Sequence, residues 1–90
     1  MMQNYYRIEF IPDAKGKHGS IHAIELWNES QLIKHATEMV RNDLNSSKIN
    51  FELQKNNVNK TSYFSDGMTK FDVFDVDRQK YLGQVVATVI

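Results

Sequence analysis

Three histidines are the side chains of this chain best suited to metal binding or acid–base chemistry, because cysteine is absent. His18 and His22 are four residues apart, the spacing that pairs two metal ligands on one face of a helix. They fall in a predicted loop and a predicted strand, where that spacing does not bring side chains together. His35 falls at the edge of the buried stripe of a predicted helix. A metal site needs three or more converging ligands, so we expect no bound metal and structural or solvated histidines.

Asp72, Asp75 and Asp77 form the one acidic cluster of the sequence. Strand alternation would place Asp75 and Asp77 on one face, where they could bind a divalent cation or receive a basic partner. The oxygen-ligand spacing of an EF-hand, with its glycine and distal glutamate, is missing. We therefore expect a solvated cluster in which Asp77 initiates the turn to Lys80.

The segment from Lys15 to Gly19 is a basic loop with two glycines, whose exposed backbone N–H groups could hold a phosphate. It lacks the spacing of a P-loop. If the loop lies near the predicted helix, a nucleic-acid site could form from Lys15, Lys17, Lys34 and Arg41. The chain has 11 basic and 11 acidic residues, and this neutral balance argues against a dedicated nucleic-acid binder. A polar hairpin tip is the favoured interpretation.

Motifs that would define an enzyme are missing from the sequence. There is no Ser-His-Asp order, no nucleophile elbow and no carboxylate pair at a recognisable spacing. We therefore expect neither catalysis nor a cofactor. One enzymatic alternative stays open, a subunit that completes its site across a homodimer with Asp75, Asp77 or His22.

The elements that must position these residues are one helix and several strands. The helix is predicted from Trp27 to Leu44, since apolar residues recur there at helical spacing and Asn28 with Gln31 has the spacing of a capping box. The buried stripe is predicted to contain Leu32, Ile33, Ala36, Met39, Val40 and Leu44.

Alternation of apolar and polar residues predicts the strands. The first two are expected to form an antiparallel hairpin, and a change of face near Val73 and Phe74 predicts a β-bulge. The predicted strands are Tyr5–Ile11, Ser20–Trp27, Lys48–Lys55, a short Thr61–Phe64, Met68–Val76 and Lys80–Ile90.

The last predicted strand, from Lys80 to Ile90, has apolar residues on both faces between Val85 and Ile90. Such a strand is expected to be central in its sheet or covered by a second subunit, because as a bare edge it would promote aggregation. A homodimer through this strand is the corresponding hypothesis.

These elements predict one α+β domain over residues 1–90, a single antiparallel sheet packed on one amphipathic helix in the order β-β-α-β-β-β. No apolar run approaches the about 20 residues needed to cross a bilayer, and the N-terminal residues lack the pattern of a signal peptide. We therefore expect a cytoplasmic protein without membrane contact.

The small size, neutral charge and missing catalytic motifs favour a non-enzymatic module that binds a larger protein. An inhibitor or accessory protein from a phage or mobile element is a role of this kind, by analogy at class level only. A nucleic-acid-binding module that uses the Lys15–Gly19 loop is the alternative. The side chains predicted to contact a partner are Lys15, Lys17, His18, Lys34, Arg41, Asp75, Asp77 and Tyr81.

Overall fold

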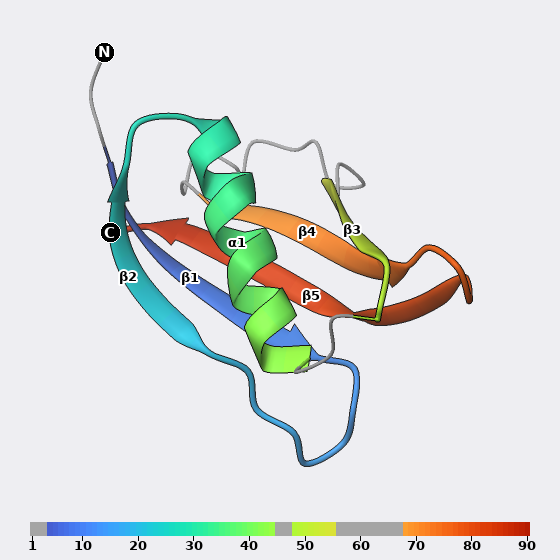
Figure 1. Cartoon of the computed structure of the whole chain (residues 1–90). Helices are drawn as coiled ribbons and strands as arrows, with labels where there is room; N and C mark the ends of the chain where they lie inside the picture. Colours follow the sequence, from blue (N-terminus) through green and yellow to red (C-terminus); the bar gives the residue numbers. More distant parts are fainter. Residues whose placement is uncertain (1–3, 45–47, 56–67) are drawn as a thin grey trace.

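The computed structural model describes residues 4–44, 48–55 and 68–90. One helix lies across one face of a five-stranded antiparallel sheet (Figure 1), which confirms the predicted α+β architecture. The elements are β1 (Asn4–Pro12), β2 (Ile21–Leu26), α1 (Glu29–Leu44), β3 (Phe51–Lys55), β4 (Met68–Asp75) and β5 (Lys80–Val89). The predicted short strand Thr61–Phe64 lies outside the described residues.

The order of strands across the sheet is β2-β1-β5-β4-β3. β1 and β2 form the predicted hairpin, and β5 pairs with β1 on one side and with β4 on the other. The prediction that the C-terminal strand is central is therefore confirmed. Because both backbone edges of β5 are used inside the sheet, a second copy of the chain would have to contact its side chains instead.

The start of α1 has the predicted cap at Asn28, and Gln31 reaches back as in a capping box but to the N–H of Trp27 instead of that of Asn28. The Asn28 side-chain oxygen accepts a hydrogen bond from the Gln31 N–H at 2.9 Å, and the Gln31 side-chain oxygen accepts one from the Trp27 N–H at 2.8 Å. These bonds satisfy backbone donors that the first turn of a helix leaves unpaired. At the other end of α1, the Asp43 carboxylate binds Ser20 just before β2.

The helix buries one stripe against the sheet, formed by Leu32, Ala36, Met39 and Val40. Ile33 was predicted to belong to this stripe, and that prediction is wrong because its side chain is 37% exposed. The sheet contributes the rest of the core: Ile8, Phe10, Leu26, Phe51, Phe71, Val73, Val85 and Ala87.

The predicted β-bulge is confirmed between β4 and β5. Val73 pairs with Gly83 and Phe74 pairs with Tyr81, so Leu82 is the extra residue, on β5. Gly83 has a φ of +146°, a backbone conformation that side-chain-bearing residues rarely adopt. An alanine Cβ at Gly83 would also lie 2.5 Å from the carbonyl oxygen of Ile11. The bulge therefore depends on glycine at this position.

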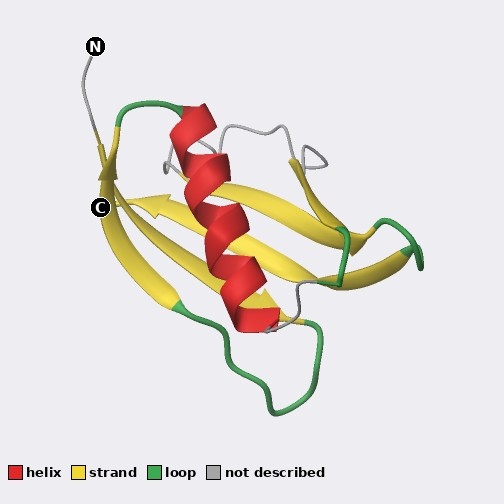
Figure 2. Cartoon of the chain, viewed as in Figure 1, coloured by secondary structure: helices red, strands yellow, loops and turns green. Residues whose placement is uncertain are grey.

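α1 covers one face of the sheet, and the other face carries no described helix or strand (Figure 2). Within the described residues, α1 is neither long nor apolar enough to span a membrane.

Candidate functional site

The face of the sheet opposite α1 is not covered by any described helix or strand. We call it the open face. Alternation along each strand and the pairing register place the outward residues. They are Ile21, Ala23 and Glu25 on β2; Tyr5, Arg7, Glu9 and Ile11 on β1; Tyr81, Gln84, Val86 and Thr88 on β5; Met68, Lys70, Asp72 and Phe74 on β4; and Glu52 and Gln54 on β3.

Large apolar side chains are exposed on this open face. Ile21 is 53% exposed and Tyr5 51%, followed by Ile11 at 45% and Tyr81 at 37%. They stand on β2, β1 and β5, which are neighbours in the sheet. The solvent face of an antiparallel sheet is commonly polar, with apolar residues only on the covered face. The open face therefore carries more large exposed apolar side chains than a purely solvated sheet face would, interspersed with polar ones.

An aromatic pair lies at the β4–β5 end of the open face. The rings of Phe74 and Tyr81 meet edge to face, with centroids 5.6 Å apart and planes at 62°. Burial raises the pKa of the Tyr81 hydroxyl above its usual value, and the charges of Asp72 and Asp13 raise it further. A hollow of about 290 Å³ adjoins Phe74; its walls are Glu52, Gln54, Phe74, Asp75, Val76 and Gln79.

Charges on the open face are mixed and more often negative. Acidic side chains come from Glu9, Glu25, Glu52 and Asp72, and basic ones from Arg7 and Lys70. Arg7 and Glu9 form an ion pair at 3.3 Å, so part of the positive charge is already neutralised. A phosphate backbone requires the opposite balance, since binding depends on basic side chains that neutralise phosphates. The open face therefore lacks the basic excess that phosphate binding requires.

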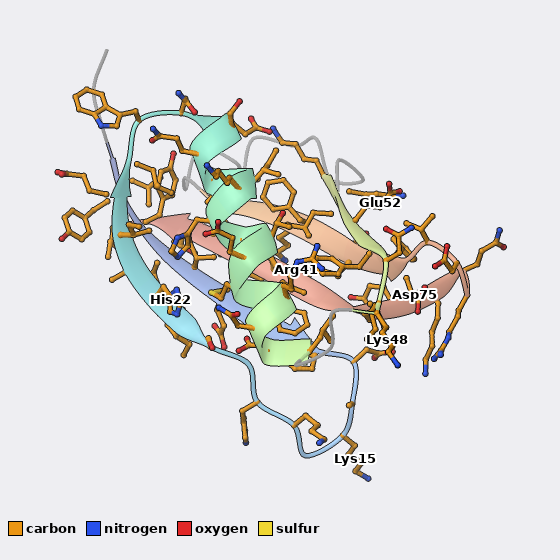
Figure 3. All side chains as sticks on the ribbon, viewed as in Figure 1. Lys15, His22, Arg41, Lys48, Glu52 and Asp75 are labelled. Carbon is orange, nitrogen blue, oxygen red and sulfur yellow. The ribbon has the colours of Figure 1, made fainter. Side chains whose placement is uncertain are left out.

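The predicted basic site is divided between two places. Lys15, Lys17 and His18 lie in the β1–β2 loop, whose tip is a turn closed by a hydrogen bond from the Lys17 N–H to the Ala14 carbonyl at 3.0 Å. Arg41 instead places its guanidinium 4.8 Å from the centre of the Phe51 ring on β3. Figure 3 shows Lys15 at the loop tip, pointing away from the helix and from Arg41. Lys34 is exposed on the outer side of α1.

The acidic cluster has a structural role that the sequence did not predict. Asp75 is 3% exposed, and its Oδ1 accepts hydrogen bonds from the N–H groups of Asp77 and Arg78, both at 3.1 Å. The prediction that Asp77 initiates the turn is therefore wrong, because Asp75 holds it. The two carboxylates also do not share a strand face, since β4 ends at Asp75. In the described part of the chain, no three His, Asp or Glu side chains converge as metal ligands.

A pair of histidines was missed at the sequence level. His22 does not meet His18; its Nδ1 lies 2.9 Å from Nε2 of His35 on α1. Burial lowers the pKa of the His35 ring, the neighbouring His22 lowers it further, and Glu38 partly opposes them. His22 shares the inward face of β2 with Ile24 and Leu26, and His35 borders the helix stripe. Both positions were predictable, but their meeting required knowing that this edge of α1 faces β2.

One antiparallel sheet and one helix place the chain in the α+β class. Comparison with models of protein families, with curated proteins and with solved structures found no match. Its function is therefore inferred from the geometry of the open face and of the side chains around it.

Proposed function

We propose that this chain is a non-enzymatic protein-binding module that docks its open face on a larger protein. The observation that carries the proposal is the exposure of four large apolar side chains on three adjacent strands, Ile21 on β2, Tyr5 and Ile11 on β1, and Tyr81 on β5. Ile11 and Ile21 are diagonal neighbours in the β1–β2 register, and Arg7 and Glu9 separate Tyr5 from Ile11. Exposed apolar surface rimmed by polar residues marks interaction sites in soluble proteins, because covering it releases water.

The chemistry of the open face is that of a protein interface. Tyrosine is a frequent anchor of such interfaces, since its ring buries a large apolar area while its hydroxyl still makes a hydrogen bond. Tyr5 and Tyr81 offer two such rings, and the Arg7–Glu9 ion pair lies between the apolar positions on β1. A partner with a complementary apolar patch and a few charged groups would fit this surface.

The role that best matches a small binding surface without catalytic motifs is that of an inhibitor or accessory protein, such as a phage or mobile element encodes against a host protein. By analogy at class level, such a module acts by covering a surface of its target. The absence of cysteine supports a reducing compartment such as the cytoplasm.

The experiment compares three forms of the chain in a pull-down from host lysate at physiological salt. The open-face variant carries Ile11→Lys and Ile21→Lys, and the control carries Ile33→Lys, which places the same charge at an exposed isoleucine of α1. Circular dichroism first confirms that all three are folded. We expect the wild type and the control to retain one stoichiometric protein and the open-face variant to lose it.

Several results would overturn this proposal. They are full retention of the partner by the open-face variant, loss of it by the Ile33→Lys control, or no retained protein at all. Capture of nucleic acid that is released steeply as salt rises would instead indicate the basic loop, because that slope reports phosphate contacts.

A further inference from the structure

The strongest feature outside the open face is the meeting of His22 and His35 at the edge of the sheet. His22 belongs to β2, an edge strand, and His35 to the side of α1 that faces it. Their ring centroids are 5.1 Å apart and their planes are inclined at 65°. His22 is exposed and His35 is partly exposed, so small ions reach the pair from solvent.

The distance between the two nitrogens matches that of two ligands on one metal ion. His22 Nδ1 and His35 Nε2 are 2.9 Å apart. Two nitrogens bound at about 2.0–2.1 Å lie about 2.9 Å apart when the N–metal–N angle is near 90°, and about 3.4 Å apart near the tetrahedral angle. The first value is already present, and the second requires a movement of about half an ångström. In the hydrogen-bonded pair a proton lies between the two nitrogens, so it must leave, and both rings must turn toward a point beside the line that joins the nitrogens, when an ion binds.

We propose that His22 and His35 form a two-histidine site for a divalent transition-metal ion of the Zn²⁺, Ni²⁺ and Cu²⁺ group, which links β2 to α1. Neutral imidazole is a preferred ligand of these ions, whereas Mg²⁺ and Ca²⁺ prefer oxygen. Two protein ligands are fewer than the three or more that hold a resident metal ion, so water completes the coordination and the ion binds reversibly. Glu38, one turn beyond His35 on α1, adds negative charge near the ring.

A metal ion at this site would stabilise the fold. The two ligands come from different elements, so they are close together in the folded chain and far apart in the unfolded one. An ion that binds only the folded state raises the folding equilibrium constant about 100-fold when its free concentration is about 100 times its Kd. Metal binding and the temperature of unfolding are therefore coupled at His22 and His35.

The test uses the full chain without a histidine tag at pH 7.5, titrated with ZnCl₂ and NiCl₂ in a calorimeter. We expect one ion per chain and a higher melting temperature with either metal, and no change with MgCl₂. His22→Gln and His35→Gln each remove one ligand, and His18→Gln is the matched control because His18 lies in the β1–β2 loop. Two linked ligands can bind an ion about 10²–10⁴ times more tightly than either ligand alone. Each single variant should therefore lose at least tenfold in affinity.

Calorimetry and circular dichroism together distinguish a variant that has lost the metal site from one that has lost the fold. Circular dichroism of the metal-free variants shows whether they remain folded, and His22→Gln with His35 intact shows whether one histidine is enough. The proposal is overturned if the wild type shows no rise in melting temperature, if either single variant keeps the wild-type affinity, or if His18→Gln loses binding.

Discussion

The carboxylate of Asp43, near the end of α1, holds Ser20, the residue before β2, through two hydrogen bonds. The Ser20 N–H donates to Oδ2 at 2.7 Å and the Ser20 hydroxyl donates to Oδ1 at 2.6 Å. A negative charge near a helix C-terminus is unfavourable with the helix dipole. The contact with Ser20 explains why an acidic residue stands there, because it fastens the helix to the edge of the sheet.

Replacing Asp43 by alanine should lower the free energy of unfolding by about 2 kcal/mol, since hydrogen bonds to a charged group are worth more than neutral ones. Ser20→Ala should cost less, because the backbone N–H stays bound. A double-mutant cycle in urea measures the coupling, and we expect about 1 kcal/mol between the two side chains. A coupling energy of zero would show that the contact does not stabilise the fold.

Gly83→Ala should destabilise the protein by about 3 kcal/mol or more, because the new Cβ meets the Ile11 carbonyl in a strained backbone region. Gly16→Ala is the matched control. Gly16 also has a positive φ, of +80°, but no atom lies within 4 Å of the position that an alanine Cβ would take there, so its cost should be about 1–2 kcal/mol. Chemical unfolding measures both, and equal losses would contradict the steric explanation.

Asp75→Ala should cost about 2 kcal/mol, because it leaves the N–H groups of Asp77 and Arg78 without their acceptor. Asp75→Asn keeps a side-chain oxygen and should cost less. Asp77→Ala should change stability by no more than about 0.5 kcal/mol, since the Asp77 side chain is exposed. Thermal unfolding of the three variants gives the order of their stabilities. A larger loss of stability for Asp77→Ala than for Asp75→Ala would show that Asp77 initiates the turn.

Alkaline titration should show that the pKa of the Tyr81 phenol lies above its usual value of about 10, because burial and the charges of Asp72 and Asp13 raise it. Its folded pKa is raised above the unfolded value, so the protonated form stabilises the fold fully below pH 10, and this contribution is lost as the pH rises through the folded pKa. The difference in ultraviolet absorbance between wild type and Tyr81→Phe isolates this group. A midpoint at or below pH 10 would contradict the burial of the hydroxyl.

The sequence predicted the elements of the fold because their signals are local. The helix cap formed by Asn28 and Gln31, the alternation of β1, and the bulge near Val73 are all patterns of spacing, and the structure confirms them. The central position of β5 was one of the two predicted alternatives, the other being cover by a second subunit; it gives β5 a neighbour on each backbone edge, while α1 covers only one of its faces.

The side-chain contacts around the candidate site depend on which helix and strands pack against each other, and residue spacing in the sequence does not predict that packing. His22 had a neighbour in sequence, His18, that is not its neighbour in space, while its contact His35 is 13 residues away. Asp75 was expected to be a solvated carboxylate because it belongs to the cluster of Asp72, Asp75 and Asp77 beside a turn. In the structure, however, it lies at the end of β4 and accepts hydrogen bonds from two backbone N–H groups. The open face was recognisable only after the register had shown which side of each strand α1 covers.

The position of β5 in the middle of the sheet also determines when the fold can be completed. During synthesis the β1–β2 hairpin, α1 and the β3–β4 pair all precede it, but β5 alone joins the two pairs of strands. The ribosome must therefore release the chain as far as Val89 before β1 and β4 acquire their common neighbour. Such non-local pairing is slow, and until it occurs the two pairs of strands lack the neighbour that β5 provides between them.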